Sequence, residues 1–214
     1  MRYQLLRFSS SMALLLAPVM AHAQSKFEGS ITMALTAPQG TTEVTYLIRG
    51  DQLRFDMPGG GGRAGYVIRD AGKNATMMVL PSQRMYMDFG ALQAMIPGGA
   101  TQAVKTPDIK ATGKKETIAG AECEHVILTA SDGQYDVCGA KGFGSFATMS
   151  SPMSRGNSGP PGLDRLGKDF FPLKVQKVGG DVAMQVTKIE KKSLDASMFA
   201  VPEGYQKMEM PGRR

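Results

Sequence analysis

The chain has 214 residues, a formal net charge of +6 and 21% charged residues. Its basic residues are scattered, as in the pairs Lys114-Lys115 and Lys191-Lys192, and no stripe of basic residues interleaved with aromatic ones occurs. Nucleic-acid-binding proteins gather such residues on one face, so we do not expect a nucleic-acid partner. The length is typical of a single domain.

A secretory signal peptide is expected at residues 1–23. Arg2 and Arg7 supply its positive region, MALLLAPVM its apolar region, and AHA the small residues before a cleavage site. The alternative, an N-terminal membrane anchor, would need roughly 20 apolar residues. We expect cleavage before Gln24, which leaves a periplasmic chain of 214 − 23 = 191 residues with a net charge of 6 − 2 = +4. Gln24 is not the cysteine that a lipoprotein needs. We therefore expect a soluble monomer, with transient membrane-surface contact at most.

Short alternating runs separated by turn residues predict strands along most of the mature chain. In chain order the strand-like segments are 27–37, 41–57 with a turn at RGDQ, 64–80 with a turn at DAGKN, 84–90, 108–120, 121–140 and 171–194 with a turn at Gly179-Gly180. This amounts to nine or ten strands in successive hairpins, which favours an antiparallel meander.

Helical segments are sparse in the predicted structure. Residues 88–96 and 141–151 are expected to form a turn or two of helix each, and 194–205 a short turn that leads to a terminal strand. Residues 151–166 are rich in Gly, Pro and Ser and are expected to form a mobile loop. A sheet with so few helices must close on itself, or curl around a helix or a ligand, to cover one face.

Two cysteines, Cys123 and Cys138, remain in the mature chain. They lie in two alternating runs joined around Ser131-Asp132-Gly133, so a hairpin places them near each other. In an oxidising compartment such a pair is most simply a disulfide. A catalytic thiol is the alternative, although no CxxC motif supports it.

Residues that could carry other chemistry are few. His125 is the single histidine of the mature chain, and zinc or copper sites normally draw on several His, Cys or carboxylate ligands. We therefore interpret His125 as an ordinary strand residue and expect no metal and no cofactor. The pair Glu122 and Glu124 fits a solvated strand face. Neither GxSxG nor a phosphate-binding loop is present, so we expect no catalytic residue.

Methionine is abundant, with 16 − 3 = 13 residues beyond the expected signal peptide, four of them in NATMMVLPSQRMYMDFG (74–90). Residues at i and i+2 of a strand share a face, so Met85 and Met87 point the same way whereas Met77 and Met78 point opposite ways. Three interpretations stay open: plain core, a flexible lining for an apolar ligand, and Cu(I) ligation by thioethers.

Several segments together resemble a known family. They are FEGSITMAL, NATMMVLPSQRMYMDFG, KKETIAGAECEHVIL and FPLKVQKVGGDVAMQVTKIEKKSLDASMFAVPEGYQKM, in this order. They look like the domain of unknown function DUF4412, over nearly the whole mature chain (24–214) as one domain. That family is similar to the LolA/LolB-like lipoprotein-carrier fold. The resemblance implies a mainly β (α+β) fold, a curved, unclosed antiparallel β-barrel with short helices covering its concave face. In LolA-like relatives the concavity binds acyl chains.

From these observations we expect a non-enzymatic periplasmic binding or carrier protein that holds a hydrophobic ligand, a lipid or a lipidated partner, in a concave sheet. Strand alternation selects the residues expected to line the concavity: Met33, Leu35, Leu47, Phe55, Met78, Met85, Met87 and Met184. A shift of register by one residue would invert any of these assignments. Two alternatives stay open: an envelope structural or stress protein that acts through protein contacts, and Met-based copper binding.

Overall fold

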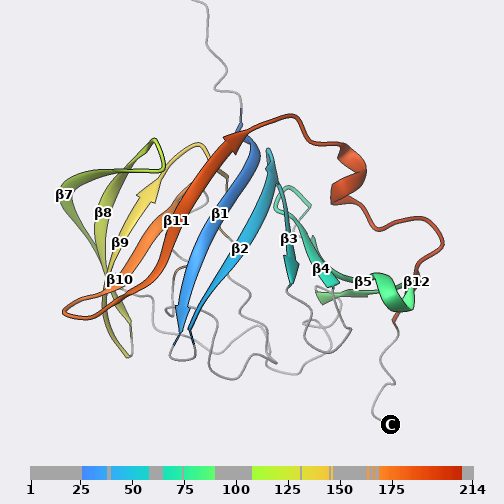
Figure 1. Cartoon of the computed structure of the whole chain (residues 1–214), viewed down its shortest axis with the longest axis horizontal. Helices are drawn as coiled ribbons and strands as arrows, with labels where there is room; N and C mark the ends of the chain where they lie inside the picture. The colour runs from blue at the N-terminus through green and yellow to red at the C-terminus, as the bar shows by residue number, and fades with distance from the viewer. Residues whose placement is uncertain are drawn as a thin grey trace, which may run out of the picture.

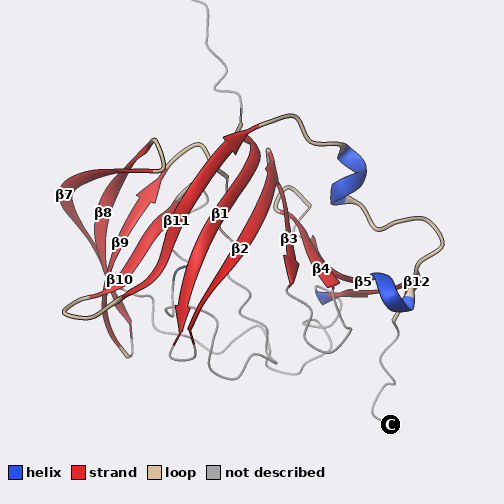
Figure 2. Cartoon of the chain, viewed as in Figure 1, coloured by secondary structure: helices blue, strands red, loops and turns tan. Residues whose placement is uncertain are grey.

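The computed structural model describes residues 26–37, 40–57, 65–73, 75–89, 108–130, 132–144, 146, 163, 166 and 169–208. Within these ranges the chain forms one curved sheet of twelve strands (Figures 1 and 2). The first six strands are β1 (Glu28–Ala37), β2 (Gly40–Arg49), β3 (Gln52–Met57), β4 (Gly65–Asp70), β5 (Ala75–Leu80) and β6 (Met85–Asp88). The others are β7 (Asp108–Ile118), β8 (Ala121–Ala130), β9 (Gly133–Ala140), β10 (Phe171–Lys177), β11 (Val182–Lys191) and β12 (Gln206–Lys207).

The strand order is β12-β6-β5-β4-β3-β2-β1-β11-β10-β9-β8-β7. The chain therefore starts in the middle of the sheet, runs as a meander to one edge, and returns from the opposite edge until β11 pairs with β1. Because β7 and β12 lie at opposite edges, the sheet is unclosed, as predicted. The antiparallel meander is also confirmed. The pairing of β1 with β11 and the parallel pairing of β12 with β6 were not predicted.

The β7–β8 hairpin shows how local sequence determines the connections. Ala119 and Gly120 form a two-residue turn in which both residues have positive φ, 49° and 82°. Tight hairpins favour this arrangement because its twist matches that of the strands. Gly120 adopts it without cost, whereas Ala119 is a residue type that rarely does.

One face of the sheet carries the main core. Directly paired residues of an antiparallel sheet share a face, so the register places Ile31, Tyr46, Phe55, Val67 and Met78 in one row. The same buried cluster includes side chains from β7 to β11, at the other end of the sheet. Side chains from both halves of one sheet meet only on its concave side, so we call this face the inner face.

Aromatic side chains from the segment before β10 fill the centre of the inner face. The ring of Phe146 lies 5.2 Å from that of Phe171 and 6.0 Å from that of Tyr46, and the ring of Phe143 lies 4.9 Å from that of Phe27. Leu163 is buried in the same cluster. Burial raises the pKa of Tyr46 to about 12, because the phenolate would lose its hydration there.

The opposite, outer face has a smaller apolar cluster over β4 and β5. It contains Tyr66, Ile68 and Val79 and is covered by Leu194 and Phe199 from the segment that follows β11. Figure 1 shows this segment crossing from the end of β11 to β12. Arg54 holds it in place: its guanidinium lies 3.8 Å from the centre of the Tyr66 ring, and its Nη1 donates to the carbonyl of Met198 at 3.2 Å.

The prediction that short helices cover the concave face was wrong for the described part of the chain. In the described part of the chain the helical elements with more than one residue are two 3-10 helices, η1 (Pro81–Gln83) and η3 (Ala196–Phe199), and η3 packs on the outer face. Phe89 and Leu163 are also helical, each beside residues that are not described. Residues 90–96, 145 and 147–151 of the expected helices lie outside the described residues, and 141–144 and 146 form no helix. The inner face is covered instead by aromatic and leucine side chains, whose packing does not depend on helical periodicity.

The expected loop and the possibility of a membrane-spanning helix can also be compared with the described residues. Of the expected loop 151–166, only Leu163 and Leu166 are described, and both pack against the inner cluster. Among the described residues no helix is long and apolar enough to cross a membrane.

Candidate functional site

Seven of the eight residues predicted to line the concavity lie on the inner face. Met33, Leu35, Phe55, Met78 and Met184 belong to or pack against the inner cluster. Met87 pairs with Met78, and Met85 lies two residues before Met87, so both share that face.

Leu47 is the exception, and its prediction as an inner-face residue was wrong. It packs against the outer cluster, while its neighbours Tyr46 and Ile48 belong to the inner one. Because side chains of a strand alternate, the assignment of Leu47 was one residue out of register.

The seven inner residues fall into two groups by exposure. Met33 (0% exposed), Met184 (5%) and Phe55 (8%) are packed core at the centre of the sheet. Leu35, Met78, Met85 and Met87 are only half-buried. A ligand would have to displace core to reach the first group, whereas the second group still has surface to offer.

The half-buried methionines gather on the last two antiparallel strands. Met78 of β5 pairs with Met87 of β6, and Leu80 pairs with Met85. We call these four residues the methionine end of the inner face. Thioether side chains are unbranched and polarizable, so they adapt to irregular apolar partners better than branched side chains do. Chemically, this surface can bind apolar groups but has no group for covalent chemistry.

Met77 provides a contrast on the same strand. It pairs with Ile68, which belongs to the outer cluster, so Met77 lies on the outer face. The opposite orientation of Met77 and Met78 agrees with the alternation expected from the sequence.

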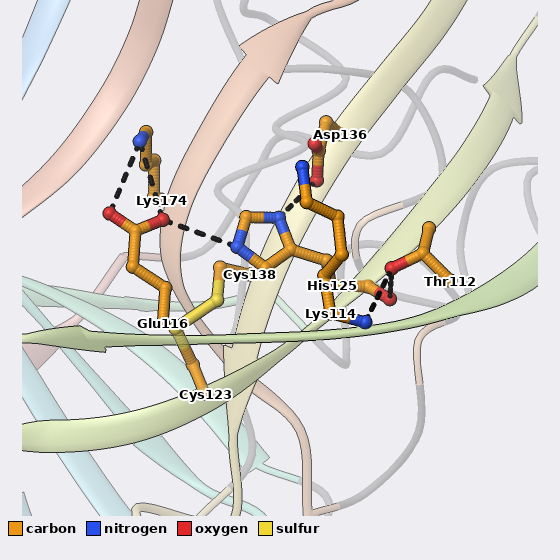
Figure 3. The surroundings of a disulfide bond; sticks show 8 residues. All are labelled: Thr112, Lys114, Glu116, Cys123, His125, Asp136, Cys138 and Lys174. Atoms are coloured by element: carbon orange, nitrogen blue, oxygen red, sulfur yellow. Dashed lines mark hydrogen bonds and ion pairs between the residues drawn. A yellow bond between two sulfur atoms is a disulfide. The ribbon is translucent and has the colours of Figure 1, made fainter.

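A second constellation lies on β7 to β10, far along the sheet from the methionine end. Figure 3 shows its side chains. The disulfide between Cys123 and Cys138 is present, as predicted, with both cysteines 1% exposed. It joins neighbouring strands, with a Cα–Cα distance of 5.4 Å. The catalytic-thiol alternative therefore has no free cysteine among the described residues.

His125 lies beside this disulfide and is not an ordinary strand residue. It is 8% exposed, its Nδ1 lies 2.6 Å from Asp136 Oδ1, and its Nε2 lies 3.2 Å from Glu116 Oε2. Lys174 Nζ lies 3.4 Å from both carboxylate oxygens of Glu116. Figure 3 shows these side chains on the same side of the sheet as the disulfide. We call Glu116, His125, Asp136 and Lys174 the histidine cluster.

The histidine cluster was missed because its members come from four strands. Glu116 pairs with Cys123, His125 with Cys138, and Cys138 with Lys174, so only the register brings them together. The available signal was the Cys-x-His spacing of Cys123 and His125, which places both on one face of β8. Glu122 and Glu124, by contrast, are exposed beside Lys115, as expected for a solvated face.

Among the residues that the structure describes, Glu116, His125 and Cys138 form the one group of three whose ligand atoms all lie within 4.8 Å of one another. Cys138 is oxidised here, and a disulfide sulfur is not a thiolate ligand. His125 Nδ1 faces Asp136 and so points away from Glu116. The oxidised cluster therefore offers two ligand groups, with the cationic Lys174 beside them, and this does not suit a metal ion.

One protein family and two solved structures resemble this chain. A family model described as "Domain of unknown function (DUF4412)" matches residues 27–205. No curated protein matches the chain significantly. A solved structure of PNGF-II in the C2 space group superposes with a TM-score of 0.52 at 12% identity, covering 86% of this chain and 31% of that one. A second, in the P21 space group, gives a TM-score of 0.44 at 14% identity, covering 81% and 30%.

The chain thus spans less than a third of the PNGF-II chains it resembles. At this identity the likeness of the first structure concerns the fold alone.

Proposed function

The chain belongs to the DUF4412 family, and on that premise we propose that it is a periplasmic binding or carrier protein that holds a hydrophobic ligand at the methionine end of its inner face. The observation that carries this proposal is the meeting of Met78, Met85 and Met87 on one face of β5 and β6, half-buried and continuous with the core. A plain core would bury these side chains fully, as it does Met33.

The ligand class follows from the chemistry of the lining. Thioethers and leucine offer dispersion contacts without directional hydrogen bonds, so an acyl chain of a lipid or of a lipidated partner suits them. Each methylene group that leaves water contributes about 0.8 kcal/mol. Binding would be an equilibrium burial without covalent chemistry, so the protein would act as a carrier and not as an enzyme.

The packed centre of the sheet limits where the ligand lies. Phe146, Phe171 and Leu163 already occupy the inner face over β1, β2 and β10. The proposal therefore places the chain of the ligand along β5 and β6. The disulfide and the expected signal peptide support an oxidising compartment such as the periplasm.

The experiment is binding of a fluorescent fatty acid to the purified protein, together with native mass spectrometry before and after organic extraction. We expect a bound mass that leaves with the solvent, and saturable uptake of the probe. Met78→Gln adds a polar amide to the lining and removes apolar contact of roughly half a buried side chain. It should weaken binding about tenfold.

Met77→Gln is the matched control, because Met77 is the adjacent residue on the opposite face. It should leave probe affinity unchanged. If Met77→Gln and Met78→Gln weaken binding equally, the ligand does not lie on the inner face. If the wild-type protein takes up no probe and has no extractable mass, the carrier proposal is wrong and a role in protein contacts becomes the better explanation.

A further inference from the structure

In the histidine cluster of the oxidised protein, two groups that can bind a cation face each other: His125 Nε2 and the Glu116 carboxylate. Asp136 accepts the Nδ1–H of His125 at 2.6 Å, and in the neutral imidazole this leaves the Nε2 lone pair facing a carboxylate oxygen of Glu116 at 3.2 Å. Two acceptors at this distance attract one another only when a proton or another cation lies between them. The cysteine sulfurs lie beside this position (Figure 3).

We propose that reduction of the Cys123–Cys138 disulfide converts this cluster into a zinc site. The ligands would be the two cysteine thiolates, His125 Nε2 and the Glu116 carboxylate. This proposal does not depend on the carrier function, which concerns the other end of the sheet.

The distances suit such a site after a small contraction. The ligand atoms of Glu116, His125 and Cys138 lie within 4.8 Å of one another, and the Cys123 sulfur is bonded to that of Cys138 at 2.06 Å. Zinc–ligand bonds of 2.0–2.3 Å place tetrahedral ligands about 3.3–3.8 Å apart. The His125 nitrogen and the Glu116 oxygen, 3.2 Å apart, already have this spacing, and each needs to approach the Cys138 sulfur by up to about 1 Å. The two sulfurs separate once their bond is broken.

Asp136 occupies the position of the carboxylates that accept a hydrogen bond from the second ring nitrogen of metal-bound histidines. Such a partner fixes the tautomer, so that the other ring nitrogen presents its lone pair to the metal, and makes the imidazole a better donor. Because β8 and β9 hold His125 and Asp136 in place, the ring is already oriented before any metal arrives.

The charges of the ligands and Lys174 also balance with a divalent ion. Two thiolates and the Glu116 carboxylate contribute three negative charges at the ligands, Zn²⁺ leaves one, and the ammonium of Lys174, 3.4 Å from both oxygens of Glu116, neutralises it. The remaining negative charge is that of Asp136, whose side chain is 31% exposed to solvent. Buried charges are tolerated only when they are paired, and the cysteines are 1% exposed. A monovalent Cu(I) would leave one more negative charge in the cluster than Zn²⁺ does.

The chemistry balances as two steps. In the first, the disulfide accepts two electrons and two protons from a dithiol reductant, which itself becomes a disulfide, and two cysteine thiols form. In the second, Zn²⁺ replaces the two thiol protons, which pass to solvent. Reoxidation of the thiols to the disulfide releases the ion, so metal occupancy would follow the redox state of the compartment.

The test uses the full chain with Co²⁺ as a spectroscopic substitute for Zn²⁺. The protein is reduced with a phosphine, its two free thiols are counted, and Co²⁺ is titrated with and without reduction. We expect one Co²⁺ per reduced chain, with thiolate charge-transfer absorption and the visible bands of a tetrahedral ion, both lost when Zn²⁺ is added. The oxidised chain should show neither.

Variants separate this site from a simple dithiol. Asp136→Asn keeps both cysteines and His125, and should lower metal affinity about 10- to 100-fold in a chelator competition. Asp181→Asn, an exposed aspartate in the β10–β11 turn, is the matched control and should leave affinity unchanged. The fold of each oxidised variant is first checked by circular dichroism and thermal melting.

Three outcomes would overturn the proposal. The first is no Co²⁺ binding by the reduced chain. The second is equal affinity of wild type, Asp136→Asn and His125→Asn, which would mean that the thiols bind metal alone. The third is loss of the β-sheet spectrum on reduction with Zn²⁺ present, because a metal that joins the same groups should maintain the fold.

Discussion

The two ends of the sheet are held together by different means. At the β7–β10 end, a disulfide and the histidine cluster connect four strands through one covalent bond, the hydrogen bond of His125 to Asp136 and the ion pair of Lys174 with Glu116. At the β4–β6 end, apolar packing covers both faces: the methionine end inside, and the segment after β11 outside. One end therefore depends on directional bonds and the other on adaptable contacts.

This difference indicates where the protein can change shape. Charge-assisted bonds and a disulfide maintain one geometry, whereas thioethers can repack around a ligand at little cost. The flexible surface lies at the end where we place ligand binding, and the redox-sensitive groups lie at the end where we place metal binding. The following predictions test this separation of roles, from the largest effect to the smallest.

Phe199→Ala should have the largest effect. Phe199 is 4% exposed and anchors η3 over Tyr66 and Val79, and truncating such a phenylalanine costs about 3–5 kcal/mol. We expect a lower free energy of unfolding, with faster hydrogen exchange concentrated in β4–β6. Val178→Ala, at a 53% exposed position, should change stability by less than about 0.5 kcal/mol. Equal exchange increases in β7–β9 would contradict independence of the two ends.

Replacing both cysteines by alanine should have the second-largest effect on stability. The disulfide closes a loop with a sequence separation of 15, for which chain entropy predicts a loss of about 3 kcal/mol. Chemical denaturation measures the loss, and exchange should rise in β7–β9 while β4–β6 stays protected. Affinity for the fatty-acid probe should be unchanged. A variant that loses probe binding but remains folded would show that the ends communicate.

Arg54→Lys should destabilise by about 1 kcal/mol. Lysine keeps the charge but cannot reproduce the flat stacking on Tyr66 together with the bond to the Met198 carbonyl. We expect a small fall in melting temperature, accompanied by faster exchange in the segment around η3. Lys115→Arg, which keeps an exposed ion pair with Glu122, is the control and should be near neutral. Unchanged exchange around η3 in Arg54→Lys would show that this contact does not hold the segment.

Tyrosine ionisation should have no effect on the stability of the fold at neutral pH. Burial, followed by the hydrogen bond to Asp132, raises the pKa of Tyr135 to about 12, while burial raises that of Tyr66 against an opposing effect of Arg54. A pKa raised on folding contributes stability that is complete below the unfolded pKa near 10 and is lost as pH rises towards 12.

Alkaline difference titrations of Tyr135→Phe and Tyr66→Phe against wild type test this order. Tyr135 should ionise at higher pH than Tyr66. The reverse order would mean that the histidine-cluster end is the more open of the two.

Much of this architecture could be predicted before any coordinates. Alternation identified most strands and the disulfide, because the hairpin from Cys123 to Cys138 is local in sequence. It also placed Met85 and Met87 on one face, since period-two geometry requires nothing from the rest of the chain. Leu47 was misassigned because alternation identifies which residues share a face but not which face is the inner one.

What the sequence by itself determined is local: strands, turns, the cysteine pair, and the relative orientation of neighbouring side chains. Tertiary structure decided the rest. The pairing of β1 with β11 depends on contacts about 150 residues apart, as between Met33 and Val186, which no local pattern encodes. The histidine cluster depends on the register of four strands at once. Backbone sterics and alternation act over a few residues, whereas register and the choice of inner face follow from how the whole sheet buries its apolar area.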